Sequence, residues 1–478
     1  MNRQKVKVGF APTRRPAPRF SIEWASRQKA LIEARLEEWD VDYVGIDWLN
    51  EEGIMFDPRD AYRVAECFKA EKVDALFTPH CNFGDEATVA ILVREVNKPL
   101  LLWGPRDQAP SPGANRFDDV QCGLFGTSKA LRRMNVPFTY IVNSPVDSAL
   151  FERGFHLFLG AAAAANNFLR ARVGQIASRP ASFWTVIINE SELLERWGIQ
   201  VVPITMADVQ KMVMEKEKGN RRELQETVAE FRAMADFSQV REEQIGRLAA
   251  LKLSLVEMYR ENGLDALAIN CSAPFRTALG VRACFVSGVL ADMGIPFGCE
   301  GDVHGALTSL LVKGAVLNTK PVLCTDLTIR HPANDDGELL WHCGCFPPSL
   351  AVEESKPWVG VDRGSAGTGN WRAKGGDLTL ARFDGDHGSY SLFIGQAKST
   401  EGPATNWTYL WMEVDDWPKW EEKFIYGPYI HHCAAVHDHV APVLYEACRY
   451  IPGLQADPLD PSESEIRAYW RGEDLENR

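Results

Sequence analysis

The chain has 478 residues, of which 45% are hydrophobic, 24% charged and 10% aromatic, and this composition argues against global disorder. A net charge of −13 without a basic block argues against nucleic acid as the main partner. No apolar run approaches the roughly 20 residues of a membrane span, so no membrane association is expected. Eleven cysteines at low density, with no secretion-signal pattern, favour reduced thiols and a cytoplasmic location.

The first third of the chain alternates strand and helix patterns. Strands are expected over residues 5–11, 42–47, 74–78 and 99–103, and helices over 21–39, 57–70 and 85–95. Ser21 is a candidate N-cap, and Asp57 followed by Pro58 is a typical helix start. Such alternation predicts an open parallel sheet that binds ligands at the carboxyl ends of its strands. Those ends carry Arg14, Arg15, His80 and Trp103.

A second alternating block follows a long helix that is expected to end near residue 173. Its predicted strands are 182–188, 199–204, 264–270 and 321–329, and its predicted helices are 206–262, broken at Gly219, and 281–293. After about residue 340, Gly, Trp and Pro become frequent. Short strands such as 378–383 and 390–394 indicate a separate β-rich domain, with loops over 364–376 and a final helix over 434–450.

Two carboxylates flank the predicted helix 306–315. Glu300 follows the apolar run 295–297, and Asp302, just after it, is favoured as the N-cap of the helix. Asp326 lies in an apolar segment where a lone charge is costly to bury, so it is either exposed at an edge or paired with a cation. Because Glu300 and Asp326 border one strand–helix–strand unit, we expect them on neighbouring strands at the same sheet edge.

Four of the ten histidines fall within nine positions, namely His431, His432, His437 and His439. Adjacent histidines need not share a face, so one can bind a metal while the other packs. His432 and His439 are about two helical turns apart and could share a helix face, whereas a structural or interface role fits His437 better.

A further candidate is His342, beside Cys343 and Cys345. No second cysteine pair has zinc-finger spacing, so a Cys-rich structural zinc site is not expected. Two carboxylates with one or two imidazoles instead suit Mn²⁺ or a similar divalent ion. The chain lacks a nucleophile elbow, a P-loop and a dinucleotide glycine fingerprint, so it predicts neither a serine hydrolase nor a nucleotide-dependent enzyme.

In the order and spacing of these motifs, the chain resembles the L-fucose isomerase and L-arabinose isomerase superfamily. Residues 5–10 with the Arg-rich turn after them, 78–81 and 102–104 resemble strand ends of the fucose isomerase N-terminal domain. Glu300 and Asp326 match the two metal-binding carboxylates of the family. Residues 342–351 resemble an arabinose isomerase segment that carries a metal-site histidine. Both branches have a ligand at the position of His432, and the fucose type also matches His439.

The resemblance implies two doubly wound α/β domains, residues 1–172 and 173–337, and a β-rich, barrel-like domain over 338–478. It implies an aldose–ketose isomerase that acts through an enediol and uses Mn²⁺, or another divalent metal such as Mg²⁺ or Co²⁺. It also implies a homohexamer, in which the first domain of one subunit closes the site of its neighbour around a monosaccharide.

The resemblance also implies a role for each site residue. Glu300 and Asp326 would be catalytic and bind the metal with His432 and His342. Arg14, Arg15, Trp103 and His342 would contact the substrate, although Trp103 could equally be a core residue and the arginines solvated or at an interface.

Three alternatives stay open at this stage. Because Asp326 follows the fucose type and His342 the arabinose type, the superfamily is better supported than either named sugar. The arginine cluster leaves an acidic sugar open, for example a sulfonated one. A non-catalytic sugar-binding or regulatory protein on the same scaffold would not need the paired carboxylates, and a metal-dependent hydrolase is a weaker possibility.

Overall fold

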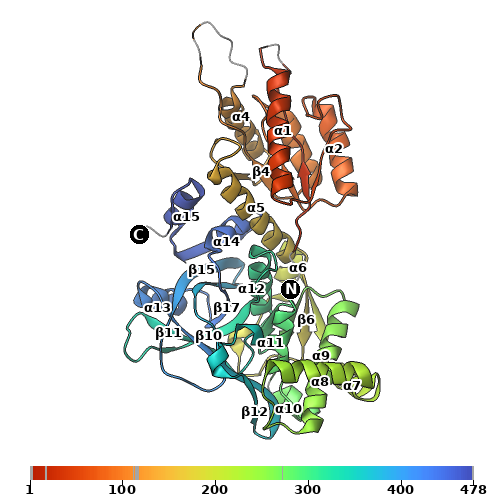
Figure 1. Ribbon diagram of the computed structural model, residues 1–478, viewed down its shortest axis with the longest axis vertical. Coiled ribbons are helices and arrows are strands. Elements are labelled where there is room, and N and C mark those ends of the chain that lie inside the picture. Colours follow the sequence, from red (N-terminus) through yellow and green to blue (C-terminus); the bar gives the residue numbers. More distant parts are fainter. Residues whose placement is uncertain (1–3, 17–18, 111, 113–117, 272, 476–478) are drawn as a thin grey trace. The chain divides into compact units, whose positions relative to one another are not determined.

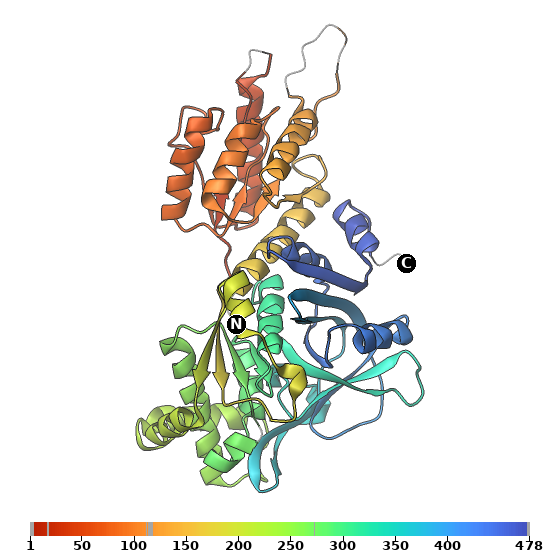
Figure 2. The same cartoon turned by 180° about the vertical axis from the view of Figure 1, so that it is seen from behind.

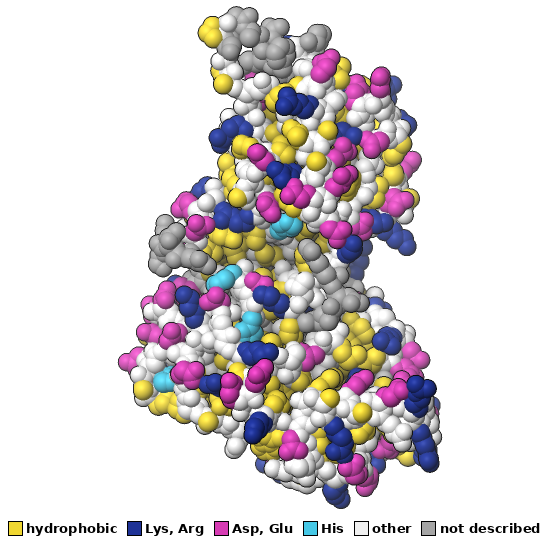
Figure 3. Space-filling model, viewed as in Figure 1, with side chains coloured by type: hydrophobic (Ala, Val, Ile, Leu, Met, Phe, Trp, Pro, Cys, Tyr) yellow, Lys and Arg dark blue, Asp and Glu magenta, His cyan; other side chains and the backbone are white. Residues whose placement is uncertain are grey.

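The computed structural model describes residues 4–16, 19–110, 112, 118–271 and 273–475. Its chain forms two compact units. One unit combines Gln4–Asn166 with the C-terminal segment from Ser464, and the other includes Asn167–Glu463. No helix among the described residues combines the length and apolarity that crossing a bilayer requires. Figure 3 shows acidic and basic side chains interspersed over the face in view.

The N-terminal unit is built on a five-stranded parallel sheet of order β2-β1-β3-β4-β5. Its strands are β1 (Val8–Phe10), β2 (Tyr43–Val44), β3 (Ala75–Phe77), β4 (Leu100–Leu102) and β5 (Thr139–Tyr140). The helices are α1 (Ile22–Glu38), α2 (Pro58–Ala70), α3 (Glu86–Val96), α4 (Val120–Arg133), most of α5 (Ala149–Phe168) and most of α15 (Glu463–Trp470). Ser21 and Asp57 cap α1 and α2 with their side chains, as predicted. The expected parallel α/β architecture of this part is confirmed.

The second unit begins with a four-stranded parallel sheet of order β7-β6-β8-β9. Its strands are β6 (Arg172–Ile176), β7 (Gln200–Ile204), β8 (Ala266–Ile269) and β9 (Phe297–Cys299). The associated helices are α6 (Glu190–Trp197), α7 (Met206–Lys218), α8 (Arg221–Met234), α9 (Glu242–Glu261), α10 (Ala273–Leu279), α11 (Cys284–Asp292) and α12 (Val303–Ala315). This sheet is the second doubly wound α/β element that the sequence predicts.

The same unit contains a mostly antiparallel sheet of order β12-β13-β16-β11-β10-β17-β14-β15-β18. Its strands are β10 (Leu323–Arg330), β11 (Gly337–His342), β12 (Trp358–Asp362), β13 (Ser365–Arg372), β14 (Asp377–Asp386), β15 (Ser389–Thr400), β16 (Thr408–Glu413), β17 (His432–Val436) and β18 (Leu454–Asp460). Helices α13 (Trp417–Tyr426) and α14 (Ala441–Cys448) accompany them. An additional pairing of β16 with β15 closes the strands between them into a ring, which confirms the barrel-like prediction.

Helix α12 connects the two sheets of this unit. It packs against β8 and β9 on one side and against β14 and β17 on the other, and almost all its residues are buried (Figures 1 and 2). The chain therefore passes from one sheet to the other between Glu300 and Asp326. The expectation that these residues lie on neighbouring strands of one sheet is wrong, because β9 and β10 belong to different sheets.

Several local predictions are also wrong. Residues 182–188 form a short 3₁₀ turn (Trp184–Val186) and not a strand, while β6 lies where the preceding helix was expected to end. The expected helix 434–450 is strand β17 followed by α14, and β13 occupies most of the expected loop 364–376. For β6, β13 and β17, pairing with neighbouring strands outweighs the local helix or loop preference.

Candidate active site

Glu300, Asp326 and His432 meet between the two sheets of the second unit. His432 Nε2 lies 3.3 Å from Glu300 Oε2 and 3.9 Å from Asp326 Oδ1. Asp326 and His432 are directly opposite in the antiparallel β10–β17 register, so they share one face. Both are buried, with exposures of 8% and 6%, and Glu300 is partly exposed. The structure thus brings together three of the four predicted ligands around His432.

The turn after β9 gives Glu300 an unusual backbone. Its φ is +58°, in the left-handed region, and Gly301 follows with φ +75°. A side-chain-bearing residue adopts this region only at an energetic cost, and such residues concentrate at functional sites. The turn places Glu300 between the end of β9 and the start of α12, where its carboxylate reaches His432 on β17.

Asp302 orients His432. Its Oδ2 lies 3.0 Å from His432 Nδ1, so in the neutral ring the Nδ1–H donates to Asp302 and the Nε2 lone pair faces Glu300 and Asp326. Asp302 also accepts from the Gly305 N–H, which confirms its predicted N-cap role, and from the fully buried Arg382. A carboxylate behind a histidine in this way is typical of metal sites, where it fixes the ring and its tautomer.

Arg382 extends a buried network that the sequence reasoning missed. Its Nε donates to Asp384 at 2.9 Å, and Asp384 contacts His304 Nδ1 at 2.9 Å. Arg382 is 80 residues from Asp302 along the chain, and only the pairing of β14 with β17 places it beneath the site. Its one sequence signal is a charge inside an otherwise apolar strand pattern.

The protonation of the cluster follows from burial and from its contacts. Burial lowers the pKa of His432, but the contacts with Asp302 and Glu300 outweigh it and raise the pKa to about 10. Burial raises the pKa of Asp326 to about 6. Burial also disfavours the ionised form of Asp302, but Arg382 and His432 outweigh it and hold that pKa well below its usual value.

Two buried polar atoms at the centre of the cluster fit a metal ion. His432 Nε2 and Asp326 Oδ1 have no hydrogen-bond partner, although leaving such atoms unpaired costs free energy. One imidazole nitrogen with carboxylate oxygens suits Mn²⁺ and similar divalent ions. His431, whose role the sequence left uncertain, also has a ring nitrogen within 4.8 Å of the ligand atoms of Asp326 and His432.

His342 borders the cluster from the end of β11. Its Nε2 is 3.9 Å from Asp326 Oδ1, and its Nδ1 accepts from the Cys343 backbone N–H at 2.8 Å. Because Nδ1 accepts, the ring proton is on Nε2, toward Asp326. In this arrangement His342 donates to a carboxylate or a substrate oxygen, which favours the substrate-contact alternative over a metal ligand.

The two other predicted histidines lie beyond β17. His439 Nε2 contacts Asp377 at 3.1 Å, and His437 Nε2 donates to the Lys374 carbonyl at 2.8 Å. Because His432 is in a strand, the proposed helix face shared with His439 is wrong. The contact of His437 is of the structural kind expected.

The remaining predicted residues belong to the N-terminal unit. Arg14 is buried, with its guanidinium 4.0 Å from the ring centre of Phe56 and 3.3 Å from Glu52. Arg15 is partly exposed and pairs with Asp85 at 3.0 Å. Trp103 is fully buried, stacks on Phe151 at 3.8 Å between ring centres, and donates to Ser144 Oγ. This is the core position left open as the alternative for Trp103.

Comparisons with known proteins agree with the resemblance. Residues 9–169 match the family model described as fucose/sulfoquinovose isomerase, N-terminal domain. A sulfoquinovose isomerase of Alkalicoccus urumqiensis is 24% identical over 332 residues, covering 69% of this chain and 73% of the relative. A sulfoquinovose isomerase of Priestia aryabhattai is 24% identical over 344 residues, covering 71% and 75%.

Solved structures give a weaker match. A solute-binding protein of an ABC transporter from Burkholderia multivorans is 12% identical, with a TM-score of 0.18 over 61% of this chain and 85% of that protein. So low a score carries no argument about the fold. The family model, the relatives and the order of motifs agree: the chain is similar to fucose isomerase-like proteins, and its residues 9–169 match the N-terminal domain of that family.

Proposed function

We propose that the protein is a divalent-metal-dependent aldose–ketose isomerase whose substrate is a sulfonated sugar of the sulfoquinovose type. The observation that carries this proposal is His432, held by Asp302 through Nδ1, with its unpaired Nε2 facing Glu300 and Asp326. The names of the relatives support both the isomerase class and the acidic sugar. The carboxylate pair also favours an enzyme over a non-catalytic sugar-binding protein.

The reaction requires removal of the C2 proton of the aldose and return of a proton to C1. Glu300, Asp326 and His432 would hold the metal, which when bound stabilises negative charge on the substrate oxygens. Asp326 is a buried carboxyl group 3.9 Å from His432 Nε2 and can take up and release the proton. Glu300 is the second carboxylate that can carry the proton, and His342 can donate to a sugar oxygen.

Arginines of the N-terminal unit could recognise the sulfonate. A sulfonate is a permanent anion, and Arg side chains bind planar or tetrahedral oxyanions well. The Arg15 side chain is 31% exposed, pairs with Asp85 at 3.0 Å and lies over the Phe83 ring, and its exposed part can contact a ligand. Arg14 is held by Glu52 and Phe56 and would shape the turn from which Arg15 extends.

The test is a substrate screen with and without metal. Purified protein with Mn²⁺ is incubated with sulfoquinovose, D-glucose, L-fucose and L-arabinose, and ketose formation is followed by NMR. We expect the highest kcat/KM for sulfoquinovose, loss of turnover after exhaustive chelation, and recovery on adding Mn²⁺. Full activity after chelation would overturn the metal-dependent mechanism, and a preference for a neutral sugar would overturn the substrate assignment.

A further inference from the structure

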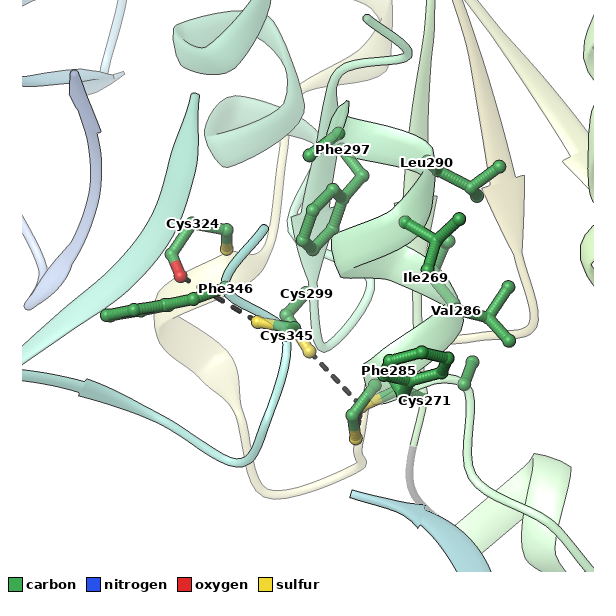
Figure 4. Packing of buried hydrophobic residues seen from close by; sticks show 14 of the residues in the cluster. Ile269, Cys271, Phe285, Val286, Leu290, Phe297, Cys299, Cys324, Cys345 and Phe346 are labelled. Atoms are coloured by element: carbon green, nitrogen blue, oxygen red, sulfur yellow. Dashed lines mark hydrogen bonds between the residues drawn. The ribbon is translucent and has the colours of Figure 1, made fainter. Parts of the chain in front are cut away.

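Four cysteines from separate segments meet in the core of the second unit. Cys271 follows β8, Cys284 begins α11, Cys299 ends β9, and Cys343 follows β11. Their sulfurs form a chain of contacts: Cys299 to Cys271 at 3.2 Å, Cys271 to Cys284 at 3.6 Å, and Cys284 to Cys343 at 3.5 Å. Figure 4 shows the thiols of Cys271 and Cys299 directed toward each other among apolar side chains.

The spacing of these sulfurs approaches that of a thiolate metal site. Four thiolates bound to one Zn²⁺ at about 2.3 Å place neighbouring sulfurs about 3.8 Å apart. The three measured separations are each within about 0.6 Å of that value. The sulfurs of Cys271, Cys284 and Cys343 lie within 4.8 Å of one another, and Cys299 lies within the same distance of Cys343. One ion could therefore contact all four after small side-chain movements.

The surroundings also suit a bound cation with thiolate ligands. Cys271, Cys284 and Cys299 are each at most 4% exposed, and all four cysteines are free thiols. Cys284 is the first residue of α11, so the helix dipole would offset part of the charge of a metal-bound thiolate. In the protonated cluster, contacts with Cys271 and Cys343 and burial raise the pKa of Cys284 well above its usual value. The Arg282 guanidinium pairs with Asp362 at 2.9 Å and also interacts electrostatically with Cys284 and Cys343.

We propose that Cys271, Cys284, Cys299 and Cys343 form a structural site for one thiophilic divalent ion of the Zn²⁺ class, distinct from the carboxylate–histidine site. On binding, each ligating thiol gives its proton to solvent, and no oxidant is needed. Zinc-finger spacing misses this site because its ligands come from four separate segments.

The position of the site suggests what it does for the protein. Cys299 immediately precedes Glu300, and Cys343 immediately follows His342. A metal bound to both cysteines would fix the ends of β9 and β11, from which these two active-site residues extend. The site therefore serves as a positioning element between the two sheets, and it takes no part in the reaction itself.

The experiment is a Co²⁺ titration of the reduced, metal-free full chain, because tetrahedral thiolate–cobalt gives an intense charge-transfer absorption that an O/N site lacks. We expect one equivalent in the wild type and in His432→Ala, and displacement by Zn²⁺. The doubly substituted Cys271→Ser/Cys284→Ser should lose the absorption at least tenfold. Cys448→Ser is the matched control, because Cys448 is also buried but contacts only a backbone carbonyl among the interactions described for its sulfur.

A second measurement keeps the test valid if the double variant does not fold. Zinc-loaded wild type is titrated with an organomercurial, and zinc release is followed with a chromogenic chelator. Release of one equivalent, with a Tm at least about 3 °C higher for zinc-loaded than for metal-free protein, supports the site. Absence of the cobalt absorption in the wild type overturns the proposal. A disulfide within the cluster of freshly purified protein, seen as two missing thiols, overturns it in favour of a redox pair.

Discussion

At the scale of single residues, the site depends on one histidine whose two nitrogens have different tasks. His432 Nδ1 is occupied by Asp302, and Nε2 is left without a hydrogen bond in a buried position. The unpaired atom is costly in the metal-free protein and becomes useful when a cation binds. The surrounding side chains keep the ring in this orientation, with Nδ1 toward Asp302 and Nε2 toward Glu300 and Asp326.

Isosteric substitution of the carboxylates tests their role. Glu300→Gln and Asp326→Asn keep the side-chain shape but remove the charge that binds metal and carries the proton. We expect each to lower kcat by at least about 10²-fold, since general acid–base loss alone costs roughly 10² to 10⁴. The measurement is turnover and metal stoichiometry, with circular dichroism as the fold control. His437→Ala should change little, because its Nε2 contacts a backbone carbonyl; loss of metal in that variant would contradict the assignment.

Asp302→Asn tests the residue behind the histidine. An amide presents the same shape to Gly305 and His432, but it no longer matches the charge of the buried Arg382. We expect the metal dissociation constant to rise about 10- to 100-fold and the Tm to fall, because breaking a buried ion pair costs about 3–5 kcal/mol.

Two measurements separate positioning from general destabilisation in Asp302→Asn. Metal affinity is measured by competition with a chelator at a temperature where the variant is folded. Excess Mn²⁺ should then restore much of the turnover, which it should not do for Asp326→Asn. Wild-type metal affinity in Asp302→Asn would show that Asp302 serves only the helix and the ion pair.

Sequence reasoning reached part of this site and missed the rest for a physical reason. Glu300 and Asp326 could be identified because each stands out locally as a charge beside an apolar run, whereas only the family resemblance selects His432 over His431. The N-cap role already accounts for an Asp at position 302, so the sequence gives no sign of its additional contact with His432. Arg382 is distant from these residues in the sequence and reaches the site through the pairing of β14 with β17. A local sequence pattern does not predict such a pairing.

At the scale of elements, the successes and errors of prediction also have physical causes. Helices α1 and α2 were predicted with their caps because Ser21 and Asp57 are strong local signals. The predicted helix 434–450 includes part of β17, where Ala434 and Ala435 have a high helix propensity. In the structure these residues are buried between β10 and β14, and strand pairing decides their conformation.

Strand β11 contains a buried carboxyl group whose ionisation lowers the free energy of unfolding as the pH rises. Glu338 is 3% exposed, its Oε2 has no hydrogen-bond partner, and burial raises its pKa to about 7. The folded state therefore binds this proton more tightly than the unfolded state does. The resulting stability is fully present below the unfolded pKa near 4.5 and is lost as the pH rises through about 7.

Glu338→Gln should remove this pH-dependent loss of stability, because the amide does not ionise. We expect its Tm to exceed that of the wild type by about 3 °C at pH 8 and to differ little at pH 5, where the folded wild type keeps the proton. Thermal unfolding at pH 5, 6, 7 and 8 measures the difference, and Glu354→Gln, at an exposed position, is the control. A Tm difference independent of pH would mean that the effect of the substitution does not arise from this ionisation.

At the scale of the whole molecule, the two units contain different parts of the proposed machinery. The carboxylates and histidines all lie within Asn167–Glu463, whereas Arg14 and Arg15 lie in the N-terminal unit. The family resemblance implies that the N-terminal domain of one subunit closes the site of another. If so, substrate binding and chemistry are provided by different chains, and a dilute monomer should be inactive.

Complementation between two inactive variants tests this arrangement. Arg15→Ala removes the proposed sulfonate contact, and Glu300→Gln removes a proposed catalytic carboxylate. Each variant alone should therefore have little activity toward the sulfonated sugar. In randomly mixed oligomers, about a quarter of the sites would combine an intact Arg15 from one chain with an intact Glu300 from another. Mixed oligomers, isolated by a different tag on each co-expressed variant, should therefore have about a quarter of the wild-type kcat. Oligomers in which every chain carries both Arg15→Ala and Glu300→Gln should be inactive. If verified mixed oligomers show no recovery, each site draws both residues from a single chain, or Arg15 does not serve the substrate.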